Sequence, residues 1–341
     1  MKFLFRADAA TAIGTGHVVR CATLAGQLSR QGHDVTFLAR ECTGNLNGWL
    51  ADTDFQVQPL PADMPDETAD AAACLAAIAD RRYDWLVVDH YGLGPAWEEA
   101  LADCAERRLA IDDLGRSHSV DLLLDQNFAN PLQARYAAIL PASCRQLLGP
   151  AYALVRPHFA ALRSAALARR HGQLERLLLC LGGSDAENET SKILAGLARS
   201  HWNGLAMDIV IGAGNPHRAE VKTACRRLPR AQLHVQTDRM AELMAAADCA
   251  ITAGGSTAWE RCTLGLPGLV TTVADNQIAI AQAMDAAGGH LLLGWYADLE
   301  GADYVRALDG LDSARLVALA TTAATICDGQ GAARVAASLT H

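Results

Sequence analysis

The chain has 341 residues, of which 51% are apolar and 20% are charged. This length suggests two compact domains, and this composition argues against chain-wide disorder or a low-complexity fibre. The 29 Lys and Arg residues and the 38 Asp and Glu residues give a formal net charge of −9. Because the sequence has no dense basic run, a nucleic-acid-binding function is disfavoured.

The sequence gives no indication of export or membrane insertion. Arg6 and Asp8 interrupt the first apolar stretch, so neither a secretory signal nor a transit peptide is expected. No later segment offers about 18 uncharged apolar residues, so a spanning helix is not expected either. We therefore expect a cytoplasmic protein without a membrane partner. The ten cysteines contain no Cys-x-x-Cys pair, and most are expected to be small core residues.

Short apolar runs alternate with stretches of helical period along the first part of the chain. Strands are predicted at 2–6, 35–39, 85–89, 109–112 and 122–125. A helix is predicted over 17–30, because apolar residues recur on one face at Val18, Cys21, Ala22, Ala25 and Leu28. This alternation predicts an α/β fold with a parallel, doubly wound sheet.

A break follows where Gly149, Pro150 and Pro157 interrupt both periodicities. A helix is predicted near 158–170. The strand pattern then restarts, with strands at 176–181, 207–211, 232–235, 249–253 and 268–273. The sequence thus predicts two Rossmann-like domains, 1–150 and 151–341. Such a pair should form an interdomain cleft at the carboxyl ends of the strands, and three glycine-containing loops are expected to face it.

The first of these loops, Ala12-Ile13-Gly14-Thr15-Gly16-His17, precedes the first long helix. Gly14 and Gly16 would let the backbone approach a substrate closely. The helix macrodipole opposes a positive charge on His17, so this side chain is expected to be neutral near pH 7 and able to accept a proton from water. The alternative is a first-turn histidine that only hydrogen-bonds a nearby loop.

The second loop, Leu181-Gly182-Gly183-Ser184-Asp185, follows a predicted strand and precedes a predicted helix at 187–197. Gly182, Gly183 and Ser184 are candidates to present amides to a phosphate or a sugar hydroxyl. The alternative is structural, with Ser184 or Asp185 serving as an ordinary helix N-cap.

The third loop contains Gly254, Gly255 and Ser256 and leads into another predicted helix. Glycines followed by a helix N-terminus bring several unpaired amides to one point, an environment that suits a diphosphate. Glu260 has two interpretations. It could complete a Thr-x-x-Glu capping box begun by Thr257, or it could bind ribose hydroxyls.

Other candidate sites are weaker. Asp112 and Asp113 are the kind of carboxylates that an inverting glycosidase uses, but neighbours on a strand point to opposite faces, so a structural role is expected for at least one of them. The Asp52-Thr53-Asp54 segment is similar to a metal-binding Asp-x-Asp motif, although a solvated turn is favoured. Because dense thiolate or carboxylate clusters are missing from the sequence, no metal and no cofactor are expected.

Seven motifs occur in a fixed order between residue 5 and about residue 277. They are FRADAATAIGTGHVVRC, VVDHYGL, IDDL, LLGPAYALVRP, LGGSDAEN, AGGSTAWERCTLGLP and ADNQ. Together they resemble the UDP-sugar hydrolases of pseudaminic acid biosynthesis, which act on UDP-2,4-diacetamido-2,4,6-trideoxy-β-L-altropyranose. The resemblance implies the two-domain GT-B architecture, as in the bacterial glycosyltransferase that makes lipid II. The segment after about residue 290 matches no motif of the family.

The resemblance also implies roles for single residues. His17 corresponds to the general base, and Tyr91 and Asn276 correspond to residues that line the same pocket. Glu260 and the Gly254-Gly255-Ser256 loop correspond to the UDP site. Water would then attack the anomeric carbon opposite UDP and cleave the C–O bond with inversion. Without that context, Tyr91 would be expected to be a packing residue and Asn276 a turn residue or helix cap.

Three functions are compatible with these observations. The favoured one is a metal-independent hydrolase that releases UDP and a free sugar. The second is a GT-B glycosyltransferase with a UDP-sugar donor, because a fold alone does not choose between water and a sugar acceptor. The third is a non-catalytic UDP-sugar-binding protein. The sequence does not indicate an oligomeric state.

Overall fold

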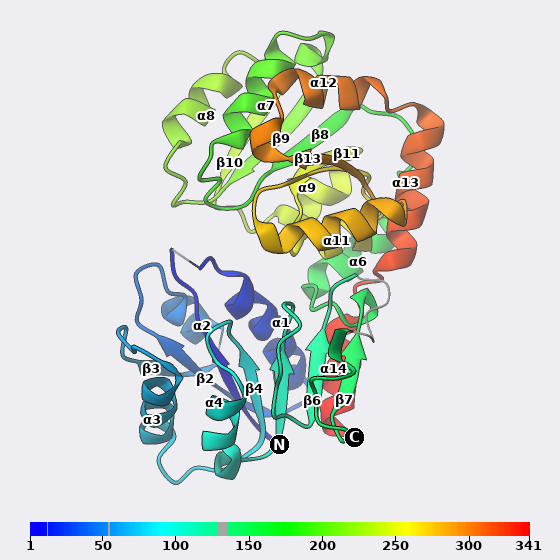
Figure 1. Cartoon of the computed structure of the whole chain (residues 1–341). Coiled ribbons are helices and arrows are strands. Elements are labelled where there is room, and N and C mark those ends of the chain that lie inside the picture. Colours follow the sequence, from blue (N-terminus) through cyan, green and yellow to red (C-terminus); the bar gives the residue numbers. More distant parts are fainter. Residues whose placement is uncertain (12, 54, 129–134) are drawn as a thin grey trace. The chain divides into compact units, whose positions relative to one another are not determined.

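The computed structural model describes residues 1–11, 13–53, 55–128 and 135–341. Its contacts divide the chain into two compact units (Figure 1). The first unit comprises Met1–Arg156 with Gln330–His341, and the second comprises Pro157–Gly329. The predicted domains 1–150 and 151–341 differ from these units chiefly at the end of the chain, which returns to the first unit.

The first unit is built on a parallel sheet with the strand order β3-β2-β1-β4-β5-β6-β7. The strands are β1 (Lys2–Ala7), β2 (Asp34–Arg40), β3 (Gln56–Leu60), β4 (Tyr83–Asp89), β5 (Ala105–Ile111), β6 (Leu122–Asp125) and β7 (Arg145–Leu148). The helices are α1 (Gly16–Arg30), α2 (Asn47–Asp52), α3 (Glu67–Ile78), α4 (Pro95–Ala100) and α14 (Gly331–Thr340).

Helices cover both faces of this sheet. On β1, Phe3 and Phe5 point into a buried cluster shared with α1 and α14, whereas Leu4 points into a second cluster that includes residues of α3 and α4. The predicted apolar face of α1 is buried from Val18 to Leu28. The prediction of a doubly wound parallel sheet is therefore confirmed.

The C-terminal helix α14, coloured red in Figure 1, packs on α1 and completes the first of these clusters. Its Leu339 is fully buried, and the indole nitrogen of Trp85 donates to the Leu339 carbonyl at 2.9 Å. A Cβ at Gly331 would collide with the backbone of Ala153, so this close approach requires glycine.

The second unit has its own parallel sheet, in the order β10-β9-β8-β11-β12-β13. The strands are β8 (Arg176–Cys180), β9 (Ala206–Ile211), β10 (Ala231–Val235), β11 (Cys249–Ala253), β12 (Gly268–Thr272) and β13 (Leu291–Trp295). The helices are α6 (Pro157–Leu167), α7 (Glu189–Ala198), α8 (Arg218–Cys225), α9 (Met240–Ala246), α10 (Thr257–Thr263), α11 (Asp275–Ala286), α12 (Gly301–Asp309) and α13 (Ser313–Ile326).

Three strands that the sequence pattern did not predict, β3, β7 and β13, all lie at sheet edges. An edge strand contacts one neighbour and tolerates residues that a central strand excludes. Pro59 occupies β3, and the pairing of β12 with β13 shifts register between Val270 and Thr271. β3 and β7 also carry polar residues, so they lack the continuous apolar run by which buried parallel strands are recognised, whereas β13 is mostly apolar.

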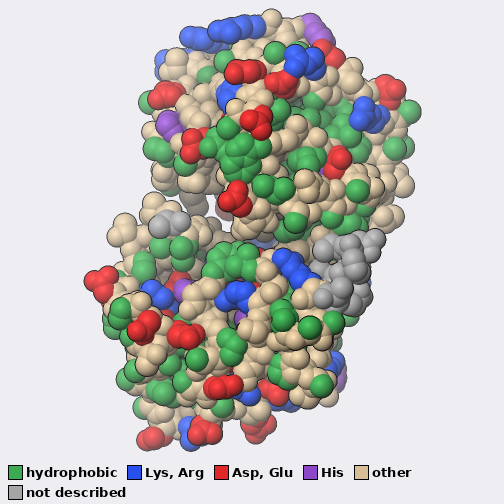
Figure 2. Space-filling view, in the orientation of Figure 1, with side chains coloured by type: hydrophobic (Ala, Val, Ile, Leu, Met, Phe, Trp, Pro, Cys, Tyr) green, Lys and Arg blue, Asp and Glu red, His purple; other side chains and the backbone are tan. Residues whose placement is uncertain are grey.

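Figure 2 shows acidic and basic side chains interspersed over the described part of the face in view. Nine of the ten cysteines are buried and all ten are free thiols, which confirms that most are small core residues. Over the described ranges of the chain, no helix combines the length and the apolar character needed to cross a bilayer.

Candidate functional site

Each sheet has one point at which the strand order reverses. In the first sheet this point lies between β1 and β4, and in the second it lies between β8 and β11. Ligands of open α/β sheets bind beyond the carboxyl ends of the strands at such a switch point. The loops predicted from sequence follow β1, β8 and β11, so each borders the switch point of its own sheet.

His17 lies in the first turn of α1, with its side chain about 10% exposed. Its Nδ1 is 2.6 Å from Oδ1 of Asp89, the last residue of β4. Its ring meets the ring of Tyr91 edge-on, with the centroids 4.6 Å apart. The switch point thus brings together two candidates from the first unit, His17 and Tyr91. It also places Asp89, two residues before Tyr91, in contact with His17.

Asp89 is buried and is held by a guanidinium. Arg20 donates from Nε and Nη2 to the two Asp89 oxygens, each at 2.6 Å, and Cys21 lies 3.6 Å from Oδ2. Burial alone would raise the pKa of Asp89, but the charges and hydrogen bonds of Arg20 and His17 hold it well below its usual value. Asp89 is therefore a carboxylate that only accepts hydrogen bonds.

This pairing fixes the tautomer of His17. Because Asp89 has no proton to donate, the short contact at Nδ1 requires that Nδ1 carry the hydrogen and donate it. In the neutral ring Nε2 then bears the lone pair. Arg20 Nη2 is also 3.2 Å from Nδ1 but is directed to Asp89.

Tyr91 is 42% exposed and follows β4 in a loop. Burial together with the charge of Asp113 raises the pKa of Tyr91 to about 12. Asp113 accepts from Arg20 Nη1 at 2.9 Å. Arg20 therefore bridges Asp89, the carboxylate that holds His17, and Asp113, the carboxylate whose charge acts on Tyr91.

The two glycines of the first loop differ in what they offer. The amide of Gly14 donates to the Ala10 carbonyl at 2.8 Å, so it is used within the loop, and its φ of 78° is left-handed. Gly16 is the exposed first residue of α1, and a Cβ there would meet no atom within 4 Å. Ala12, at the start of this loop, lies outside the described residues, as does Asp54.

In the second loop Gly182, Gly183 and Ser184 are exposed. Asp185 is buried and accepts from the amides of Glu189 and Thr190, each at 3.0 Å. The N-cap of α7 is Asn188, so neither Ser184 nor Asp185 is its ordinary N-cap. The Asp185 carboxylate nevertheless occupies the amides at the start of α7 that an anion would need.

In the third loop the carbonyls of Gly255 and Ser256 accept from Ala258 and Trp259, so this loop runs directly into α10. The N-cap is Ser256, without a side-chain bond, and α10 starts at Thr257. The capping-box interpretation is therefore wrong, because the helix begins one residue too early for Glu260 to occupy the third helical position.

Glu260 lies in α10, which follows β11, one of the two strands at the switch point. Burial and the charges of Glu260 and Asp185 raise the pKa of the Cys180 thiol, at the end of β8, to about 11. Asn276 is an exposed residue in the first turn of α11, after β12. The N-cap of α11 is Ala274, so Asn276 is not a helix cap.

Asp112 has a structural role, as expected for one member of its pair. It is buried and accepts from the amides of Gly115 and Arg116, from the Arg116 side chain and from the Tyr136 hydroxyl. Asp113 instead faces Arg20.

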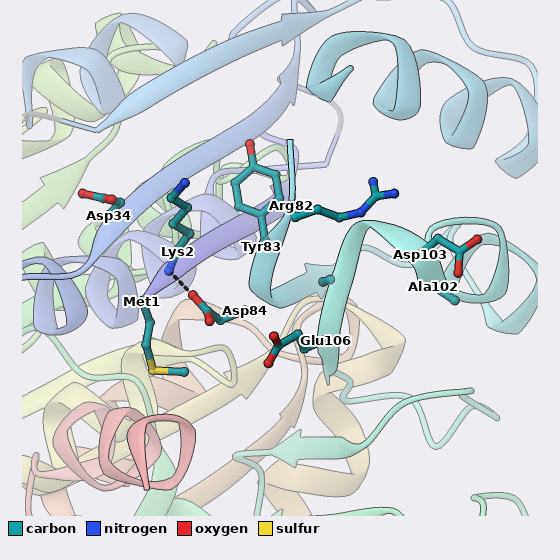
Figure 3. Close-up of a pocket in the computed structure, with 10 residues that line it drawn as sticks. Met1, Lys2, Asp34, Arg82, Tyr83, Asp84, Ala102, Asp103 and Glu106 are labelled. Atoms are coloured by element: carbon teal, nitrogen blue, oxygen red, sulfur yellow. Dashed lines mark hydrogen bonds between the residues drawn. The ribbon is translucent and has the colours of Figure 1, made fainter. Parts of the chain in front are cut away.

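A cavity of about 820 Å³ lies elsewhere in the first unit, at the amino ends of β1, β2, β4 and β5 (Figure 3). Its lining mixes charges of both signs, and the Lys2 amide is bonded to Asp84 across it. His17 and Asp89 lie at the carboxyl ends of the strands of the same sheet, so the cavity and the His17 site are separate. Among the described residues, no three His, Cys, Asp or Glu side chains cluster so as to hold a metal ion.

Sequence reasoning missed Asp89, Arg20 and Asp113 as members of the site. Two signals were present. Arg20 is three residues after His17, which places both on one face of α1, and Asp89 ends a predicted strand within a motif of the family.

Comparisons with known proteins support the resemblance, although no family model matches the chain. The UDP-2,4-diacetamido-2,4,6-trideoxy-β-L-altropyranose hydrolase of Campylobacter jejuni is 26% identical over 245 residues, covering 72% of this chain and 81% of that protein. The spore coat polysaccharide biosynthesis protein SpsG of Bacillus subtilis is 26% identical over 292 residues, covering 84% and 82%.

Among solved structures, MurG of Acinetobacter baumannii has a TM-score of 0.70 at 16% identity, over 99% of each chain. This similarity confirms the GT-B glycosyltransferase fold. The resemblance to the hydrolase that the motifs indicated is likewise confirmed.

Asp89→Asn should destabilise the first unit, because it leaves the buried Arg20 without its main counter-charge. The expected loss in the free energy of unfolding is about 3 kcal/mol. Asp113→Asn is the matched control, since it removes a single bond from the same guanidinium at a carboxylate that is 15% exposed, and should cost about 1 kcal/mol or less. Urea unfolding of the two variants measures the difference, and equal losses would contradict the assignment of Asp89 as the buried anchor.

Proposed function

We propose that this chain hydrolyses UDP-2,4-diacetamido-2,4,6-trideoxy-β-L-altropyranose in pseudaminic acid biosynthesis, cleaving the C–O bond with inversion. The similarity to the Campylobacter jejuni hydrolase supports an enzyme that acts on UDP-sugars. The observation that carries the proposal is the pairing of His17 with the buried Asp89 at the switch point of the first sheet.

His17 is the proposed general base. Nε2 accepts a proton from water as the water oxygen bonds to the anomeric carbon, and the bond from that carbon to the UDP oxygen breaks. Asp89 keeps Nε2 in the accepting tautomer and stabilises the imidazolium that forms. General-base catalysis of this kind contributes roughly a hundredfold to ten-thousandfold.

The leaving UDP needs hydrogen-bond donors more than it needs an acid, because a diphosphate is already a good leaving group. We assign it to Gly254, Gly255 and Ser256 at the start of α10. Since Asp185 occupies the first amides of α7, Gly182, Gly183 and Ser184 are assigned to UDP through their exposed loop rather than through that helix. Glu260 is assigned to the ribose hydroxyls.

The remaining assignments concern the sugar. Tyr91 covers one edge of the His17 ring, and Gly16 leaves open space at the start of α1. Gly14 shapes the loop between β1 and α1 through its bonds to Ala10. Asn276, exposed after β12, is assigned to the substrate as well.

A second candidate function is sugar transfer to an acceptor other than water, with which the fold shared with MurG is equally compatible. The two candidates differ in their products. A transferase should release UDP faster when its acceptor is added and should form a glycosylated product, whereas a hydrolase releases UDP and free sugar without an acceptor.

Hydrolysis in oxygen-18 water tests the proposed reaction. The purified protein is incubated with a panel of UDP-diacetamido-sugars, and the label is located by mass spectrometry. We expect stoichiometric UDP and label in the free sugar. Label in UDP would show cleavage of the phosphorus–oxygen bond and would refute the mechanism.

His17→Gln should slow turnover by about a hundredfold or more, because glutamine cannot accept the proton from water. Affinity for UDP should change by less than about twofold, since the diphosphate is assigned to the second unit. Calorimetric titration with UDP and a UDP-release assay measure the two quantities. A folded variant with undiminished turnover would remove His17 from its role.

Gly255→Ala should weaken UDP binding by about tenfold, because the added methyl group would obstruct the close approach of the diphosphate to the loop backbone. The fold should accept the change, because the added Cβ would lie 3.9 Å from its nearest neighbour, Gln277, and the backbone there is not left-handed. Gly204→Ala is the matched control, with open space around it at the end of a short helix far along the chain from the loop. Unchanged UDP affinity in a folded Gly255→Ala protein would argue against this loop as the diphosphate site.

A further inference from the structure

The turn that carries Tyr91 is short. Leu93 at its end is buried in the core, whereas Tyr91 has little apolar cover. The turn follows Asp89 directly and is closed by a bond from the Leu93 amide to the His90 carbonyl at 3.5 Å. Tyr91 is 42% exposed, so packing alone does little to fix its ring against His17.

One side chain from a neighbouring loop, that of Arg116, donates hydrogen bonds to three carbonyls of this turn. Arg116 Nη1 donates to the carbonyls of Tyr91 and Leu93, each at 2.9 Å, and Nη2 donates to the His90 carbonyl at 3.2 Å. Three carbonyls within four residues therefore point at a single guanidinium.

The same guanidinium is anchored on its other side. Arg116 Nε donates to Asp112 Oδ1 at 2.8 Å, and Asp112 also accepts from the Arg116 amide. His118 lies behind Asp112 and bonds Glu98 at 2.5 Å. Burial would raise the pKa of Asp112, but the nearby His118 and the bonds from Arg116 hold it well below its usual value, so the anchor is charged.

This geometry needs the planar fork of arginine. An ammonium is a point charge with three donors on a flexible stem, and it cannot reach a carboxylate and three carbonyls that lie around a plane. Lysine at this position would keep the charge and lose most of the bonds.

We propose that Arg116 is a positioning residue for the reaction: it holds the 90–93 turn so that the Tyr91 ring lies across His17. This inference rests on the proposed function for its catalytic consequence. Arg116 itself touches no reacting atom and acts through the backbone of the turn.

The test compares Arg116→Lys with Arg108→Lys. Arg108 is a matched control. Its side chain also donates to a backbone carbonyl, that of Glu98, and its Nε lies 4.0 Å from the carboxylate of Asp121. Two quantities are measured for each: hydrogen–deuterium exchange of the segment 89–94, and kcat and KM for UDP release. Arg116→Gln serves as the second variant should the lysine variant not fold.

For Arg116→Lys we expect exchange in 89–94 to rise and kcat to fall, each by about tenfold, with KM changed by less than about twofold. In a Tyr91→Ala protein, adding Arg116→Lys should lower kcat little further, because the ring that Arg116 positions is already absent. Arg108→Lys should leave the exchange of 89–94 and kcat at their wild-type values.

Several outcomes would overturn the inference. Wild-type exchange in 89–94 would show that Arg116 does not hold the turn, and an undiminished loss of kcat in the Tyr91→Ala background would show that it acts by another route. A wild-type chain that releases no UDP would instead be a failure of the proposed function, and the exchange measurement would still decide whether Arg116 fixes the turn.

Discussion

The contact on which the site depends is the one between Asp89, Arg20 and His17. A buried carboxylate is costly unless it is paired, and the bidentate bonds from Arg20 provide that pairing without taking the place of the imidazole. Since Asp89 ends a central strand and His17 begins the helix after the adjacent strand, the fold itself sets the distance between them. Without this contact, nothing in the site would require the hydrogen of the neutral imidazole to lie on Nδ1.

The two sheets place different residues at the same topological feature. At the switch point of the first sheet lie an imidazole, its carboxylate partner and an aromatic ring. At that of the second lie glycine loops and a helix start. Asp185 makes the second arrangement asymmetric, because it occupies the amides at the start of α7, and for this reason we propose the loop before α10 as the diphosphate site.

Sequence reasoning reached those features that are local in the chain. His17 could be found because glycines and a helix start surround it, and the central strands because they are continuously apolar. The pairing of Asp89 with His17 could not, since it spans two strands that become neighbours only in the folded sheet. Of the two interpretations of Glu260, the capping box is wrong because α10 starts one residue earlier than it requires. The segment that forms α14 was assigned to the second domain, because its partners lie at the other end of the chain.

The central claim is that Asp89 holds His17 with hydrogen on Nδ1 and a free lone pair on Nε2. Nitrogen-15 NMR of histidine-labelled protein, with the His17 signals assigned by comparison with His17→Gln, observes this tautomer directly. The account predicts a protonated Nδ1 and an unprotonated Nε2 in the neutral ring. A neutral ring protonated on Nε2 would contradict it.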